Sequence, residues 1–177
     1  SLAEEVEKEV KKLDEENRKL DRDSTETVKE LNKKNERLDR ESKRKVDEVI
    51  EKLERLKGTD REIVERIAEE VKEIVKELEE EYRRAKRENE EVVKKLRDEY
   101  RRLEERNKKA LKDIRDKLLD VKEKLDELAD ELKKSLDRSR RILERLEEEL
   151  RRSIRRSEDI LRRLKEELER VIRELRR

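Results

Sequence analysis

An 18-residue unit occurs twice in succession near the start of the chain, over residues 15–32 and 33–50. Eighteen residues make five turns of an α-helix, so side chains that recur at this interval return to the same face without drifting. A seven-residue repeat would instead impose a left-handed supercoil. The interval therefore predicts straight helices. The residues that match between the two copies are Asn17/Asn35, Leu20/Leu38, Asp21/Asp39, Arg22/Arg40, Ser24/Ser42 and Val28/Val46.

The same interval recurs further along the chain, where residues 82–99 match 100–117 and residues 132–149 match 150–167. In all three regions the apolar residues follow spacings of three and four, which on a helix give one stripe of roughly 80° to 120°. No second apolar face is present. This pattern predicts an all-α fold in which three helices each bury one side against the other two.

Helix boundaries are marked by short polar residues that Glu follows three positions later, at Ser1, Thr59 and Asp120. Gly58 is the only glycine, and it follows Leu56 at a place where a helix C-terminus needs a left-handed residue. We expect a single straight up-down-up three-helix bundle over 1–177, with helices of about 55 residues and about 80 Å. The expected helices are 2–57, 60–118 and 121–176.

Composition excludes most chemistry. Charged residues make up 62% of the chain, and Cys, His, Pro, Met, Trp and Phe are absent. Without His or Cys there is no general base near neutrality and no thiolate nucleophile. One glycine cannot build a phosphate-binding loop, and the carboxylates lie among Lys and Arg on polar faces. We therefore expect no enzyme activity, no cofactor and no metal.

Partners are also constrained. No apolar run exceeds two residues, so the sequence predicts neither a membrane span nor a targeting signal, and a soluble chain is expected. Residues 133–177 contain 17 basic side chains, but 11 acidic side chains are interspersed among them. A concentrated basic surface is therefore not expected. The two tyrosines are the only aromatic residues, so nucleic-acid binding is not expected. No partner is required, and no cellular location follows from the sequence.

Polar residues occupy the apolar stripe in the two central repeats of each predicted helix. One repeat outward their places are taken by apolar residues such as Val6, Leu53 and Val71. A buried polar group left unpaired costs about 1–3 kcal/mol, so these residues are expected to hydrogen-bond one another. The predicted network residues are Asn17, Ser24, Asn35, Ser42, Tyr82, Asn89, Tyr100, Asn107, Ser135, Ser139, Ser153 and Ser157.

Up-down-up folding predicts two groups of these residues at two heights, about 27 Å apart. Such networks add specificity, because a wrong register strands their polar groups. Two other interpretations exist: unrelated polar substitutions in a wet interior, and a ligand pocket around the tyrosines. The predicted groups are Asn35, Tyr82, Ser153 and Ser157, and Asn17, Tyr100, Ser135 and Ser139.

With these features in place, the chain resembles computationally designed, untwisted helical bundles that contain buried hydrogen-bond networks. The resemblance covers the whole chain and rests on the 18-residue interval, the Asn/Ser/Tyr core positions, the depleted alphabet and the Gly58-Thr59-Asp60 connector. It implies a stable scaffold, made to test or use core networks, without a natural biochemical activity. The predicted second turn lacks glycine, which departs from usual practice in such designs.

Two alternatives concern assembly. The apolar positions of the second helix continue in phase beyond residue 120, so a continuous helix over 60–177 would allow a domain-swapped antiparallel homodimer. The closed monomer is favoured, because Leu119 would otherwise lie off the stripe and the Asp120 cap would have no helix start to serve. The second alternative is an interaction module that docks a partner or a second copy through Thr25, Thr27 and Asn32.

Overall fold

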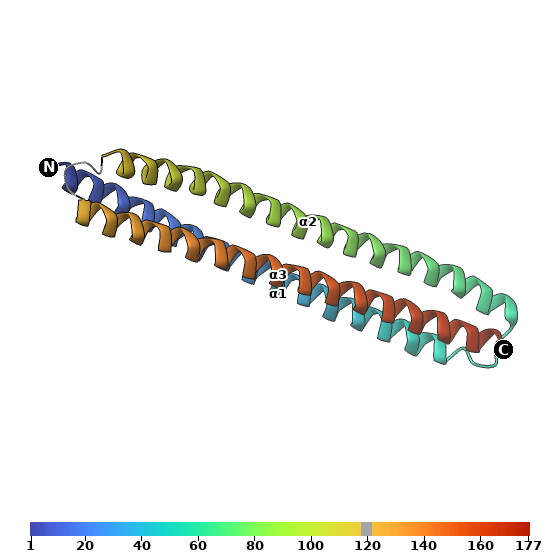
Figure 1. The fold of residues 1–177 in the computed structure, drawn as a ribbon. Coiled ribbons are helices and arrows are strands. Elements are labelled where there is room, and N and C mark those ends of the chain that lie inside the picture. Colours follow the sequence, from blue (N-terminus) through green and yellow to red (C-terminus); the bar gives the residue numbers. More distant parts are fainter. Residues whose placement is uncertain (118–121) are drawn as a thin grey trace. The chain divides into compact units, whose positions relative to one another are not determined.

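The computed structural model describes residues 1–117 and 122–177 and confirms the all-α prediction for this part of the chain. Three helices follow one another: α1 (Leu2–Glu54), α2 (Arg61–Asp116) and α3 (Lys122–Arg176), of 53, 56 and 55 residues (Figure 1). The expected turn at 118–121, with Leu119 and the Asp120 cap, lies outside the described residues. The same is true of the hinge on which the domain-swap hypothesis depends.

The start of α1 follows the expected capping pattern. The Glu4 amide donates to the Ser1 hydroxyl at 3.4 Å, and the Glu5 amide donates to the Ser1 carbonyl at 3.2 Å. Ser1 therefore satisfies amides of the first turn, which have no partner within the helix.

The turn between α1 and α2 departs from the prediction in two respects. Helix α1 ends at Glu54 rather than near residue 57. The amides of Leu56 and Lys57 donate to the carbonyls of Leu53 and Glu54, three residues earlier, and not to carbonyls four residues earlier as in an α-helix. The Thr59 hydroxyl donates backwards to the Leu56 carbonyl instead of capping α2. The Asp60 carbonyl accepts the first amides of α2, so the helix starts one residue later than expected. Gly58 has φ +85°, as its position predicted.

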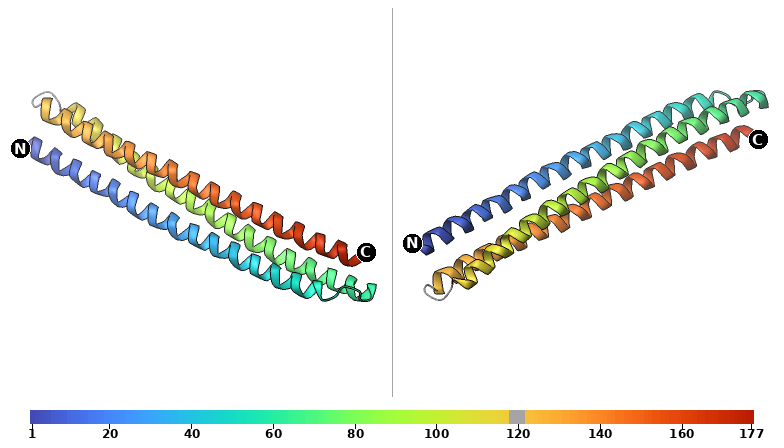
Figure 2. Two further views of the ribbon diagram at one scale, coloured as in Figure 1. Left: turned by 90° about the horizontal axis from the view of Figure 1, so that it is seen from below. Right: turned by 90° about the horizontal axis from the view of Figure 1, so that it is seen from above.

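The helices contribute segments to two compact units. Unit 1 contains Ser1–Lys29 and Glu91–Leu150, and unit 2 contains Glu30–Glu90 and Arg151–Arg177. In each unit a segment of α2 runs antiparallel to segments of α1 and α3, as the predicted up-down-up order requires (Figure 2). That the whole chain forms one straight bundle stays a prediction.

Each unit has its own apolar core, built from all three helices. The stripe residues point inward because apolar side chains at spacings of three and four share one helix face. In unit 1 the buried cluster is Val6, Val10, Leu13, Ala110, Ile114, Leu125, Leu128 and Leu132. In unit 2 it is Val46, Leu53, Val71, Leu78, Leu164, Leu168 and Val171. Of the helices described, none is long and apolar enough to cross a membrane.

Candidate functional site

The most specific polar contact in unit 2 is a reciprocal pair of amides. The Asn35 Nδ2 group donates to Asn89 Oδ1 at 3.0 Å, and Asn89 Nδ2 donates to Asn35 Oδ1 at 3.1 Å. Asn35 also donates to the Ser153 hydroxyl at 2.8 Å, and Asn89 donates to the Ala85 carbonyl at 2.7 Å. We call Asn35, Asn89 and Ser153 layer 2. It joins α1, α2 and α3 through side chains.

Unit 1 contains the same arrangement, displaced by one repeat along each helix. Asn17 and Asn107 exchange two hydrogen bonds of 3.0 Å. Asn17 also donates to the Ser135 hydroxyl at 2.9 Å, and Asn107 donates to the Leu103 carbonyl at 2.7 Å. We call Asn17, Asn107 and Ser135 layer 1. Each of its hydrogen bonds is nearly equal in length to its counterpart in layer 2.

The geometry satisfies the amides fully. An asparagine side chain carries two N–H donors and one carbonyl acceptor. In each layer both donors of both asparagines are used, and each carbonyl accepts from the opposite amide. The four asparagines are between 0 and 2% exposed, so no water competes for these groups. Burial of four polar side chains is therefore offset by hydrogen bonds.

A second polar contact lies one turn from layer 2, around the buried carboxylate of Asp39. Its Oδ1 atom accepts the Tyr82 hydroxyl at 2.9 Å, and its Oδ2 atom accepts the Ser157 hydroxyl at 3.3 Å. Burial raises the pKa of Asp39, and these two hydrogen bonds counteract the rise. Burial also raises the pKa of Tyr82, since an ionised phenol would lose its solvation beside a carboxylate.

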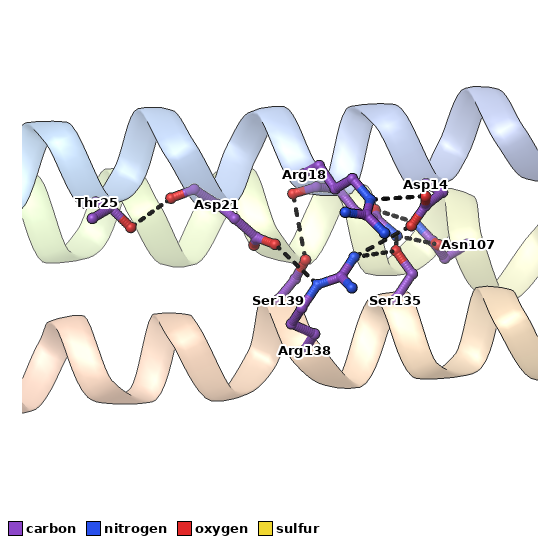
Figure 3. Close-up of polar contacts among 9 residues, drawn as sticks. Asp14, Arg18, Asp21, Thr25, Asn107, Ser135, Arg138 and Ser139 are labelled. Atoms are coloured by element: carbon purple, nitrogen blue, oxygen red, sulfur yellow. Dashed lines mark hydrogen bonds and ion pairs between the residues drawn. The ribbon is translucent and has the colours of Figure 1, made fainter.

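The corresponding carboxylate of unit 1, Asp21, has a different environment (Figure 3). The Arg138 Nε atom lies 3.8 Å from Asp21 Oδ2, and its terminal nitrogen donates to Asp14 Oδ1 at 3.3 Å. Burial raises the pKa of Asp21, while a hydrogen bond from Ser139 and the charge of Arg138 lower it. Burial acts to raise the pKa of Asp14 too, but hydrogen bonds from Ser135 and Arg18 outweigh it, and this pKa is lowered.

The two tyrosines, which the sequence treats as equivalent, differ in the structure. Tyr82 is buried, whereas Tyr100 is half-buried. Burial, together with the nearby carboxylate of Glu104, raises the pKa of Tyr100 to about 12.

The remaining predicted residues are serines, and all of them are buried. The Ser139 hydroxyl donates to the main-chain carbonyl of Asn17 at 3.5 Å, which is long for a hydrogen bond. Ser42 forms a hydrogen bond that acts to lower the pKa of Tyr82, against the effect of burial. Ser24 is 5% exposed and packs in the core of unit 1. The structure therefore places eleven of the twelve residues in buried positions and leaves Tyr100 at the edge.

The predicted grouping changes in both units. Sequence spacing placed Tyr82 at the height of Asn35 and Tyr100 at the height of Asn17, but Asn89 and Asn107 occupy those places. Tyr82 instead meets Asp39, one turn from Asn35. Asp21 and Asp39 were missed as members of the buried polar set, although both are only 9% exposed. Asp21 and Asp39 match at the 18-residue interval as the asparagines do, but the exposed Arg22 and Arg40 match in the same way, so the interval alone does not indicate burial.

A groove of about 250 Å³ lies between α2 and α3 of unit 2, beside Tyr82 and Ala85. Its apolar wall includes Ile154 and Leu161, and Ser157 also lines it. Among the described residues no group of three or more acidic side chains is placed to hold a metal ion.

No protein-family model and no curated protein matches the chain. A solved structure described as a "Computationally designed three helix bundle" is similar, with 21% sequence identity and a TM-score of 0.44. The alignment covers 98% of this chain and 85% of that one.

Proposed function

We propose that this chain is a designed structural scaffold without a natural biochemical activity, and that its buried polar layers select one arrangement of the three helices. The supporting observation is the reciprocal amide pair, which occurs in both units with the same four hydrogen bonds. An amide pair shared by α1 and α2 is satisfied only when the two asparagines face each other. An apolar contact between leucines would tolerate many more arrangements.

The magnitudes explain why such layers contribute specificity rather than stability. A satisfied buried hydrogen bond contributes about 0.5–1.5 kcal/mol, which is close to what a well-packed apolar replacement would contribute. An unpaired buried amide, by contrast, costs about 1–3 kcal/mol. The layers therefore add little to the free energy of the correct fold. They raise the free energy of each alternative in which the asparagines do not meet.

The test compares the parent with a variant in which Asn17, Asn35, Asn89 and Asn107 are all replaced by Leu. We expect this variant to fold and to unfold at an equal or higher denaturant concentration. We also expect it to lose uniqueness, seen as several sets of amide resonances or as more than one mass in light scattering. A variant that shows one set of resonances and the mass of the parent would contradict the proposal.

A further inference from the structure

Two ion pairs of unit 1 recur in unit 2 with their charges exchanged between helices. Glu16 on α1 and Arg106 on α2 lie 3.0 Å apart. One repeat along each helix the corresponding residues are Lys34 on α1 and Glu88 on α2, which lie 2.8 Å apart. The interface between α1 and α2 therefore has opposite polarity in the two units, although the asparagine layers there are the same.

The interface between α2 and α3 shows the same exchange. Arg97 on α2 donates two hydrogen bonds to Glu147 on α3, at 2.7 and 3.0 Å, in unit 1. The corresponding residues in unit 2 are Glu79 on α2 and Lys165 on α3, with 2.8 Å between the charged atoms. Glu147 is only 12% exposed at its side chain, so its charge is sensitive to the sign of what faces it.

Identical layers leave one competing arrangement poorly excluded, namely association of copies staggered by one repeat. In that arrangement the apolar stripes still coincide, since they follow the same interval. One amide pair also survives. Staggered one way, Asn17 meets Asn89, and staggered the other way, Asn35 meets Asn107. Head-to-tail contacts of this kind do not close and lead to open-ended assemblies.

The exchanged charges penalise this stagger in both directions. One way, Glu16 faces Glu88, and the other way, Lys34 faces Arg106. A stagger between α2 and α3 brings like charges together as well: Glu79 faces Glu147, or Arg97 faces Lys165. Like charges in place of an opposite pair raise the free energy of the wrong partner without changing the right one.

We propose that these four charge-exchanged pairs are the determinants that keep the chain from associating with copies of itself at a stagger of one repeat. This inference rests on the proposed function, because the layers define the stagger that the charges exclude. The determinant is the alternation of sign between the units. The strength of any one pair is secondary, since exposed ion pairs contribute little to folding.

The experiment uses a uniform variant of the full chain, with Lys34→Glu, Glu88→Arg, Glu79→Arg and Lys165→Glu. Each native pair remains oppositely charged and the net charge is unchanged, but every staggered pair becomes oppositely charged too. The matched control carries Glu16→Arg, Arg106→Glu, Lys34→Glu and Glu88→Arg, which reverses both α1–α2 pairs and preserves the alternation. A second variant with Lys34→Glu and Glu88→Arg alone serves if the uniform variant loses its helical circular dichroism.

Both variants and the parent are refolded at increasing concentration, and their masses are measured by light scattering. We expect the average mass of the uniform variant to rise at least about twofold above that of the parent, while the control keeps the mass of the parent. Equal masses of the uniform variant and the parent would overturn the proposal. A rise in the control as large as in the uniform variant would overturn it as well.

A second readout separates a stagger from other association. The chain has no cysteine, so one nitroxide label is placed at Arg40→Cys in some molecules and at Arg66→Cys or Arg102→Cys in others. The native pairing of Asn35 with Asn89 puts Arg40 at the height of residue 84, so a stagger of one repeat brings it to the height of Arg66 or Arg102. Short distances between labels then arise only when α1 of one copy meets α2 of another. A domain swap through 118–121 would exchange α3 and produce no such signal. The variant with four leucines tests the proposed function, and the uniform variant tests this inference, so the two can fail independently.

Discussion

Asn17 and Asn35 illustrate what a buried amide requires. Each lies in the stripe of α1 and donates to two helices at once, so its burial is compatible with one arrangement of neighbours. Because the two layers have the same bonds at nearly equal lengths, the molecule contains an internal replicate of one interaction. The same substitution should therefore have the same energetic cost in layer 1 as in layer 2.

Replacing one asparagine of a pair is expected to cost more than replacing both. Asn35→Leu leaves the Asn89 amide without its partner and should lower the free energy of unfolding by about 1–3 kcal/mol. Adding Asn89→Leu removes the orphaned amide and should recover most of that loss. Denaturant unfolding measures both, and Asn17→Leu with Asn107→Leu is the control. Different costs in the two layers would show that the geometry does not determine the energy.

Asp39 predicts a pH dependence. Burial raises its pKa in the folded state. Hydrogen bonds from the Tyr82 and Ser157 hydroxyls and the charge of Arg156 on α3 act against this rise, and the charge of Glu36 on α1 adds to it. The folded state thus holds the proton more tightly than the unfolded state. The contribution of Asp39 to stability should be fully present below the ordinary Asp pKa of 3.8 and should be lost as pH rises through the raised value.

The measurement is the free energy of unfolding between pH 3 and pH 7 for the parent and for Asp39→Asn. The amide oxygen still accepts a hydroxyl but carries no charge, so the variant should lose this part of the pH dependence and be the more stable protein near neutrality. Asp21→Asn is the comparison, since Arg138 lies near that carboxylate and gives its charge some compensation. If Asp39→Asn leaves the profile unchanged, burial of this carboxylate has no energetic consequence.

At the scale of elements, ion pairs between helices differ according to how far they are removed from water. Glu147 is 12% exposed and accepts two hydrogen bonds from Arg97, whereas Glu65 and Arg176 are 49 and 41% exposed. Arg97→Ala should lower the free energy of unfolding by about 1 kcal/mol, because it removes two charge-assisted hydrogen bonds whose donor side chain is half solvated. Arg176→Ala should change it by less than about 0.5 kcal/mol.

The turn between α1 and α2 depends on Gly58. Its φ of +85° is unfavourable for other residues, and a side-chain Cβ there would meet nothing within 4 Å. The expected cost of Gly58→Ala is therefore purely conformational, about 1 kcal/mol in the free energy of unfolding. Thr59→Ala, which removes only the hydroxyl bond to the Leu56 carbonyl, is a milder change in the same turn. A larger loss for Thr59→Ala than for Gly58→Ala would contradict this account.

The sequence predicts the three helices better than it predicts their end residues or the contacts of their side chains across helices. Helices α1, α2 and α3 were predicted because one apolar stripe at helical spacing leaves no alternative fold class. The end of α1 at Glu54 was missed, because the stripe continues through Leu56 and periodicity does not report where hydrogen bonds change type. Asp21 and Asp39 were missed because an aspartate beside a stripe normally marks a solvated face, and only contacts across helices reveal its burial.

At the scale of the whole molecule, each unit contains segments of all three helices. The α3 segments come either from the same chain as α1 and α2, in a closed monomer, or from a second copy, in a domain-swapped homodimer. A closed chain predicts a mass of 21.8 kDa that does not change with concentration. A domain-swapped homodimer would have about twice that mass, with the same contacts inside each unit. We expect the closed monomer, measured by light scattering from micromolar to millimolar concentration.

An insertion at the predicted second turn separates the two outcomes. The insert is the four-residue sequence Gly-Ser-Gly-Ser, placed between positions 118 and 121. It disfavours a continuous helix, because each glycine in a helix interior costs about 1 kcal/mol relative to alanine. A chain that is already a closed monomer should keep its mass and its unfolding midpoint after the insertion. A chain that is a swapped dimer should convert to the monomer mass. A doubled mass both before and after the insertion would exclude the swap and indicate docking of folded copies through an outer face.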